Sequence, residues 1–231
     1  MLTVLRREEK YPLYLRESFS YIALFSQLLQ ADTASANGSY MVRSLYFDTI
    51  DDKDFFDKMN EQNLRRKIRL RIYSPNAKTA KLEMKQKENQ FQRKRSLSVS
   101  REHARQLVQG NYSVLLQYSE PFAAELFALM NEECYRPKSI VEYQRRAFMA
   151  PENNIRITFD TEIRATESNT ELFSAQLPLY SVYPTDRAIL EVKYNHFLPS
   201  YLSDVVSAID KRKVSSSKYC QSRSIGYPLY L

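Results

Sequence analysis

Glycine is scarce in this sequence. Only Gly38, Gly110 and Gly226 occur among 231 residues. A P-loop or a dinucleotide-binding fingerprint needs several clustered glycines, so that backbone N–H groups can surround the phosphates. The sequence therefore excludes both motifs, and any phosphate has to be bound by side chains.

Cysteines and long apolar runs are also few. Cys134 and Cys220 form no C-x-x-C pair, which argues against a disulfide framework and a structural zinc site. We expect both to be small buried hydrophobes in a reduced, cytoplasmic setting. No apolar run reaches the roughly 18 residues of a membrane helix. Charges from Arg6 to Lys10 interrupt the N-terminal stretch, so we expect no signal peptide.

Positive charge is in excess. The formal net charge is +7, with 43% hydrophobic and 26% charged residues. This is an ordinary globular composition, and the length suits one large domain or two small ones. The basic balance predicts an anionic partner: nucleic acid, a phosphate polymer, a nucleotide or a membrane surface.

Charged and apolar residues alternate in several segments, as in KIRLRIY from Lys67 to Tyr73. Alternate side chains of a strand point to opposite faces, so each such segment has one charged and one apolar face. About eight strands are expected: residues 5–11, 40–47, 67–73, 80–85, 93–99, 139–148, 155–160 and 188–194. Helical spacing predicts helices between them: residues 21–29, 51–60, 101–109, 120–133 and 201–209.

The charged faces mix cations with a few carboxylates. The carboxylates recur as E-x-K at Glu8, Glu83 and Glu191. Two architectures fit this pattern. In an antiparallel sandwich the apolar faces meet and the charged faces are wet. In a closed barrel the charged faces point inward and helices cover the apolar exterior. Inward cations are costly unless a polyanion matches them, and the matching ligand would be a polyphosphate group with a divalent metal.

Eight short motifs carry a family resemblance. They stand in the order R-x-E-x-K-Y, SLYFDT, RLR, E-x-K, Y-x-R-x-A-F, R-I-x-F-D, LEVKY and SKYC, from Arg6 to Cys220. In this order they resemble the VTC-type polyphosphate polymerase domain of the triphosphate tunnel (CYTH-like) superfamily. The resemblance spans nearly the whole chain and implies one domain over residues 1–231.

The resemblance implies an α+β fold: a closed, antiparallel tunnel barrel of about eight strands with a charged interior, flanked by helices. It also implies a phosphotransferase that adds the γ-phosphate of ATP to inorganic polyphosphate, with Mn²⁺ or Mg²⁺. The implied ligands are ATP and polyphosphate rather than nucleic acid. Domains of this type are linked to membrane assemblies, which here would require a membrane protein on a separate chain.

The resemblance assigns roles to residues at matching motif positions. Glu191 corresponds to a metal-binding glutamate. The relatives that hydrolyse triphosphates begin E-x-E-x-K, whereas this chain has Arg6 at the first position. This loss of a carboxylate favours the polymerase branch and leaves Glu8 as an additional metal ligand. The implied catalytic residues are Arg69, Arg71 and Lys218, and the implied phosphate-binding residues are Lys10, Lys85, Lys94, Tyr143, Arg145, Arg156, Lys193 and Ser217. Lys94 is assigned in preference to its neighbours Arg93 and Arg95. The R-K-R run itself leaves open which of the three residues has this register.

Three rival functions are distinguishable by product or ligand. A tunnel triphosphatase would release inorganic phosphate, and a silent polyphosphate- or nucleotide-binding module would bind without turnover. A nucleic-acid binder would use aromatic stacking, but no signature of such a domain is present. Phosphoryl transfer to an anionic acceptor needs no general base, so we expect His103 and His196 to have structural roles.

Overall fold

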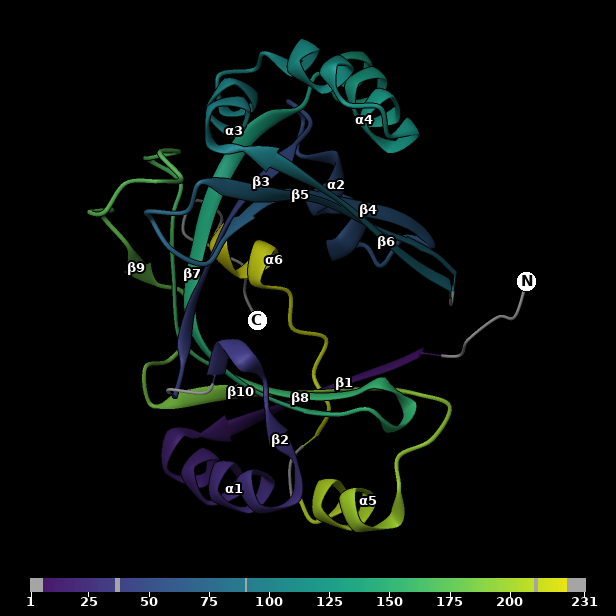
Figure 1. Ribbon diagram of the computed structural model, residues 1–231, viewed down its shortest axis with the longest axis vertical. Helices are drawn as coiled ribbons and strands as arrows, with labels where there is room; N and C mark the ends of the chain where they lie inside the picture. Colours follow the sequence, from purple (N-terminus) through teal and green to yellow (C-terminus); the bar gives the residue numbers. More distant parts are fainter. Residues whose placement is uncertain (1–5, 36–37, 90, 210–211, 224–231) are drawn as a thin grey trace. The chain divides into compact units, whose positions relative to one another are not determined.

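The computed structural model describes residues 6–35, 38–89, 91–209 and 212–223 (Figure 1). The chain forms two compact units. Unit 1 consists of residues 1–41, 143–163 and 183–217, and unit 2 consists of residues 42–142, 164–182 and 218–231. Each unit therefore combines segments that lie far apart in the sequence.

The strands pair in the order β1-β10-β8-β7-β3-β4-β5-β6, with β2 added to β7 and β9 to β8. The pairs β1–β10, β10–β8, β3–β4, β4–β5 and β5–β6 are antiparallel. An antiparallel α+β fold is thus confirmed. Among the described residues this order ends at β1 and β6, so the predicted closure of the barrel is not confirmed.

All eight predicted strands are present, and each is longer than predicted, although the predicted first residue of the N-terminal strand, Leu5, lies outside the described residues. Their bounds are β1 (Arg6–Tyr14), β3 (Tyr40–Asp48), β4 (Leu64–Ile72), β5 (Thr79–Glu88), β6 (Phe91–Ser100), β7 (Arg136–Ala150), β8 (Ile155–Thr166) and β10 (Arg187–Asn195). The two-residue strands β2 (Gln30–Ala31) and β9 (Tyr180–Ser181) complete the sheet.

The predicted helices are also present. They are α1 (Leu15–Leu28), α2 (Lys53–Met59), α3 (Arg101–Val108), α4 (Pro121–Glu132) and α5 (Ser200–Ser207). Pro121 begins α4, where its missing N–H costs no helical hydrogen bond. The short helix α6 (Lys218–Arg223) was not predicted, because six residues are too few to show helical periodicity. No described helix has both the length and the apolar character to cross a membrane.

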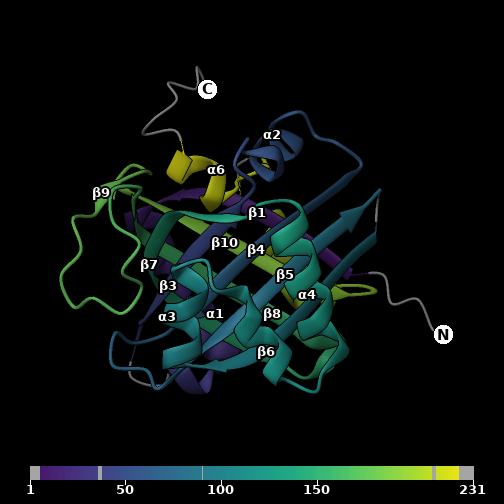
Figure 2. The same ribbon diagram turned by 90° about the horizontal axis from the view of Figure 1, so that it is seen from above.

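In unit 2, helices α3 and α4 cover the apolar face of β4, β5 and β6 (Figures 1 and 2). Ile68, Leu70 and Ile72 of β4 are fully buried in this core. Ala104 of α3 and Leu126 of α4 lie in the same cluster. The apolar half of KIRLRIY is therefore a helix-covered wall, as predicted, and Arg69 and Arg71 occupy the opposite face.

In unit 1, helices α1 and α5 cover the apolar face of β1, β8 and β10. Val192 of β10 and Ile157 of β8 are opposite each other in the register. Both are fully buried with Phe25 of α1 and Leu202 of α5. The charged residues of these strands have the other parity, so unit 1 repeats the arrangement of unit 2.

One burial prediction was wrong. Cys220 is buried in α6, but Cys134 is exposed. Cys134 has φ of 50° in the turn between α4 and β7. A turn that needs the left-handed region lies at the surface, and composition alone does not reveal such a position.

Candidate functional site

A buried carboxylate organises the basic face of unit 2. Glu83 of β5 lies opposite Arg69 of β4, and the Nε and Nη2 atoms of Arg69 are each 2.7 Å from its Oε2. Arg71 Nη1 is 3.9 Å from the same oxygen, and Lys94 of β6 forms an ion pair with Oε1. Two predicted catalytic arginines of β4 and one predicted phosphate ligand of β6 thus converge on one residue of the strand between them.

Charge dominates the environment of Glu83. Burial raises the pKa of this carboxyl, but Arg69, Arg71 and Lys94 outweigh burial and lower the pKa to about 2. Glu83 is therefore ionised at neutral pH, and it offsets only part of the positive charge around it. Cations held in place before a ligand arrives need little reorganisation to bind an anion.

The register settles which residue of the R-K-R run joins this face. Lys94 lies opposite Lys85, and Lys85 lies opposite Lys67 of β4. Arg95 has the other parity, bonds Glu125 of α4 and stacks over Phe122 at 4.7 Å. Lys94 is therefore on the charged face with Lys85, as predicted, and Arg95 serves the helix-covered face.

Tyr46 and Ser44 of β3 extend the basic face and were not predicted. Arg69 Nη1 donates to the Tyr46 hydroxyl at 3.2 Å, and Arg71 Nε donates to Ser44 Oγ at 3.1 Å. Burial raises the pKa of Tyr46, but Arg69, Arg71 and Lys67 outweigh burial and lower it. The alternation of polar and apolar residues in SLYFDT indicates one polar strand face, because the basic segments show the same strand pattern.

Helix α6 packs within unit 2 through its second residue. Tyr219 is buried, stacks on Tyr46 with ring centroids 5.0 Å apart, and donates to Asp48 Oδ2 at 2.5 Å. Ser222 and Arg223 add contacts to Ser139, Asp52 and Glu167. Lys218, which was predicted to be catalytic, is the first residue of this anchored helix.

In unit 1, two E-x-K motifs interlock. Glu8 lies opposite Lys193, and Lys10 lies opposite Glu191, because β1 and β10 are antiparallel. Lys10 Nζ is 3.3 Å from Glu8 and 3.9 Å from Glu191, while Lys193 Nζ is 3.0 Å from Glu191 and 3.9 Å from Glu8. The predicted metal ligands and two predicted phosphate ligands thus form one four-residue network.

Arg145 of β7 extends this network. Its Nε and Nη2 bind the two oxygens of Asp160 at 2.6 and 2.7 Å, and Nη2 is 3.7 Å from Glu191. The guanidinium lies 5.2 Å from the ring centroid of Tyr143, which is also buried. Burial lowers the pKa of Arg145, but Asp160, Tyr143 and Glu191 outweigh burial and raise it. Arg145 is a fixed cation, and the Asp160 that fixes it was not predicted.

Arg156 is held by neighbours that the sequence did not indicate. It has the charged-face parity and lies opposite Lys193. Its Nη2 donates to Asp32 at 2.6 Å and to the Tyr40 hydroxyl at 3.1 Å. A phosphate would have to share this arginine with Asp32.

A strap formed by residues 212–217 lies along β1. Val214 N–H donates to the Lys10 carbonyl at 2.9 Å, and Lys10 Nζ donates to the Ser216 carbonyl at 2.8 Å. Lys213 is paired with Glu9 at 2.7 Å on the other face of the strand. The strap therefore brings Ser217, the residue after Ser216, next to the predicted phosphate ligand Lys10.

The residues of unit 1 fit a divalent metal delivered with phosphate. Glu8 and Glu191 would supply carboxylate oxygens, the ligands that Mg²⁺ and Mn²⁺ prefer. Thr158 lies opposite Glu191, and its hydroxyl oxygen is buried without a hydrogen-bond partner. Within the described residues no three His, Cys, Asp or Glu side chains are grouped to hold a metal. Two carboxylates completed by substrate oxygens are the usual arrangement for Mg²⁺.

The two histidines lie outside these networks. His103 of α3 pairs with the Tyr118 hydroxyl at 2.8 Å on the helix-covered side of unit 2. His196 follows β10 with φ of 57°. The structural role of both histidines stays a prediction.

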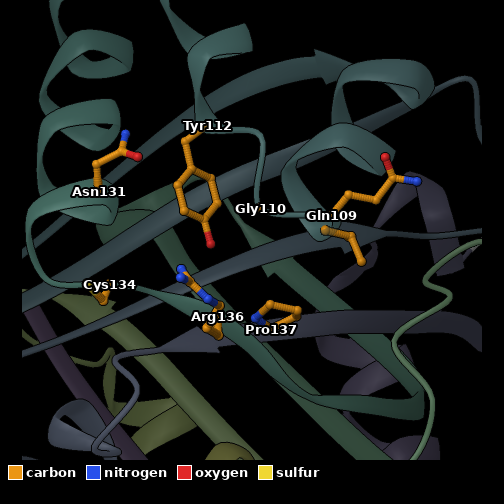
Figure 3. A pocket seen from close by; sticks show the side chains of 8 residues that line it. Gln109, Gly110, Tyr112, Asn131, Cys134, Arg136 and Pro137 are labelled. Atoms are coloured by element: carbon orange, nitrogen blue, oxygen red, sulfur yellow. The ribbon is translucent and has the colours of Figure 1, made fainter.

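A pocket of about 450 Å³ lies elsewhere in unit 2 (Figure 3). Its lining includes Gln109, Tyr112, Asn131, Cys134 and Arg136. None of the residues predicted to bind phosphate or metal lines it. The basic faces, rather than this pocket, are therefore the candidate site.

One family model matches nearly the whole chain. Residues 5–227 match the VTC domain. A search of curated proteins finds no match. Among solved structures, HpAC1 of Hippeastrum is similar, with a TM-score of 0.57, 11% identity and 96% coverage of each chain. It is named an adenylyl cyclase candidate in which triphosphatase activity is dominant.

A second similar structure is that of a candidate adenylate cyclase from Bacillus halodurans. Its TM-score is 0.51, with 10% identity and 93% coverage of each chain. At such identities the likeness concerns the fold. The match to the VTC domain confirms the family that the sequence motifs indicated.

Proposed function

The chain belongs to the VTC domain family, and we propose that it is a polyphosphate polymerase that transfers the γ-phosphate of ATP to a growing inorganic polyphosphate chain. One observation carries this proposal. Arg69, Arg71 and Lys94 are assembled by side-chain contacts around Glu83, in a chain with almost no glycine for a backbone phosphate loop. Such a site suits a multiply charged phosphate ligand.

The closed tunnel is part of the proposal. We propose that residues 1–231 act as one domain and that its strands close into a tunnel barrel with a charged interior, as the sequence resemblance implies. Arg69 and Arg71 bind the transferring phosphoryl group bidentately, and Lys218 contributes a further charge. Lys10, Lys85, Lys94, Tyr143, Arg145, Arg156, Lys193 and Ser217 bind the remaining phosphate oxygens.

The transfer balances without an external acid or base. A terminal oxygen of polyphosphate forms a bond to the γ-phosphorus, the bond to the β,γ-bridging oxygen breaks, and ADP leaves. The polymer grows by one phosphate. Fixed cations stabilise the charge on the transferring group, and positioning supplies most of the catalysis. Mn²⁺ or Mg²⁺, when held by Glu191 and Glu8, supplies Lewis-acid neutralisation of the phosphate oxygens.

Triphosphate hydrolysis is the second candidate function. HpAC1, which has a similar fold, has a dominant triphosphatase activity. Hydrolysis needs a water nucleophile whose proton must be accepted, whereas the polyphosphate terminus is already anionic. Arg6 in place of a first carboxylate removes one acidic group that could serve a water or a metal.

Simultaneous measurement of ADP and inorganic phosphate separates these functions. Purified protein is incubated with ATP and Mn²⁺, and both products are quantified over time. Polymerisation predicts that ADP accumulates in large excess over free phosphate. Equal amounts of the two products would identify a triphosphatase, and the absence of both, with ATP bound, would identify a silent binding module.

We propose a cytoplasmic protein whose ligands are ATP and polyphosphate, not nucleic acid. A link to a membrane would require a membrane protein on a separate chain. Co-purification of the tagged protein from a membrane fraction before and after a salt wash would detect such a partner.

A further inference from the structure

Two rows of cations continue the basic face of unit 2 beyond Glu83. The first row is Lys67, Lys85 and Lys94, which lie opposite one another on β4, β5 and β6. In the second row, Arg65 lies opposite Lys87, and Lys87 lies opposite Gln92. All these positions share the parity of Arg69 and Glu83, so they lie on the same face.

This arrangement places like charges side by side on neighbouring strands. Like charges directly opposite each other on neighbouring strands destabilise a sheet. The Lys67–Lys85–Lys94 row and the Arg65–Lys87 pair place cation beside cation in three strand pairings. No carboxylate occupies a position in either row. The sequence resemblance assigns Lys85 and Lys94 to phosphate, but it gives no reason for Lys67, Arg65 and Lys87.

The rows have a direction and a length. From Arg69 to Arg65 is four residues along β4, or about 14 Å at the usual strand rise. The cations continue toward the end of β5, where Lys87 is the last residue but one. Their side chains are half-buried at Arg65, Lys67 and Lys87. A line of charges two residues apart suits a linear polyanion, and a single triphosphate held at Arg69 and Arg71 would not span it.

We propose that Lys67, Arg65 and Lys87 form a track that binds the phosphates of a linear polyphosphate beyond the triphosphate at the reacting end. This inference rests on the proposed function and deepens it, because it names the feature that distinguishes a long polymer from a nucleotide. The track gives long chains a higher affinity than tripolyphosphate, and its contribution is electrostatic and sensitive to salt.

Equilibrium binding tests the track without relying on turnover. The Arg65→Gln/Lys87→Gln variant removes the second row and leaves every residue of the proposed catalytic site intact. The matched control is Lys78→Gln/Arg105→Gln, which removes two exposed cations of unit 2 that lie outside the rows. The probes are tripolyphosphate and a linear polyphosphate of several tens of phosphates, each titrated at several salt concentrations.

The expected result is selective. The track variant should lose at least about tenfold in affinity for long polyphosphate. The slope of log affinity against log salt should become shallower by about 0.7 for each cation removed. The affinity of the track variant for tripolyphosphate should stay within about twofold of wild type. The affinities of the control variant for both probes should do the same. Relief of like-charge repulsion should leave the track variant at least as resistant to urea as wild type.

Other outcomes overturn the track in distinguishable ways. Equal losses of affinity for both probes would mean that these cations contribute to binding of any phosphate ligand and do not distinguish long chains from short ones. Unchanged polymer affinity would show that the rows are solvated surface, while the proposed function would stand if Arg71→Ala still abolished binding of both probes. Equal affinity of wild type for single-stranded RNA of matched charge would reject linear polyphosphate as the specific occupant. Failure of wild type to bind either phosphate probe would reject both proposals.

Discussion

The hydroxyl of Tyr219 donates to Oδ2 of Asp48 at 2.5 Å, and both residues are buried. Asp48 also accepts from the backbone N–H groups of Thr49, Asp54 and Phe55, so one carboxylate holds the start of α2 and the start of α6. Burial raises the pKa of Asp48 despite these donors. The helix that begins with the predicted catalytic Lys218 is thereby tied to the strand that carries Tyr46.

Tyr219→Phe should weaken this tie without removing the aromatic packing. The variant leaves Asp48 with one donor fewer, at an expected cost of about 1–3 kcal/mol in the free energy of unfolding. Urea denaturation measures this loss. Because α6 presents Lys218, turnover should fall more than stability alone explains, while a Ser222→Ala variant of the same helix should affect turnover less. If folded Tyr219→Phe kept wild-type turnover, the role of Lys218 would not depend on the hydrogen bond from Tyr219.

Arg71→Ala and Lys218→Ala should each lower turnover by about a hundredfold or more, because each removes a fixed charge from the transferring group. The fold should survive, since neither side chain belongs to the apolar core. Steady-state kinetics with circular dichroism measure both effects. His103→Ala is the control and should retain most of the activity. If His103→Ala abolished turnover instead, the assignment of the chemistry to the basic face would be wrong.

Glu191→Gln should separate binding from turnover. The amide keeps the shape of the side chain but loses the charge that would hold Mn²⁺ or Mg²⁺. ATP binding without metal should change little, whereas turnover should fall severely and higher Mn²⁺ should restore part of it. Calorimetric titration of Mn²⁺ in the presence of a non-hydrolysable ATP analogue measures the metal affinity directly. Equal turnover of the variant and wild type at limiting Mn²⁺ would remove Glu191 from the metal site.

Lowering the pH should reveal how much Glu83 contributes to the stability of the folded state. Its pKa is depressed from 4.5 to about 2, so its ionised form stabilises the folded state above pH 4.5. That stabilisation is lost progressively as the pH falls from 4.5 through 2. Glu83→Gln should therefore be less stable than wild type at pH 7, and the difference should shrink over the acid range. Urea midpoints across this range test the trend, and a pH-independent difference would contradict it.

The sequence predicts one layer of this fold well. In KIRLRIY and LEVKY the period of two assigns each side chain to a face, and the buried Ile68 and Val192 confirm the assignment. Amphipathic spacing likewise located α1 and α4. These predictions succeed because burial of an apolar face acts within a single element.

Periodicity does not predict which side chains on different strands contact each other. Periodicity places Arg145 and Tyr143 on one face of β7, but it does not give the bidentate partner Asp160, because the register between strands depends on the whole sheet. The link from Arg156 to Asp32 joins residues 124 positions apart. Tyr46 could have been predicted from its alternation, whereas the buried hydroxyl of Thr158 gave no local signal.

Phosphorus NMR of the reaction with ATP and Mn²⁺ tests the central claim most directly. Internal phosphates of a polymer resonate apart from end groups, ATP and free phosphate, so the spectrum reports the new phosphoanhydride bonds themselves. The account predicts a growing signal from internal phosphates as ATP is converted to ADP, absent with Arg71→Ala. Conversion of ATP to ADP and free phosphate, with no internal phosphates formed by a folded wild-type protein, would contradict it.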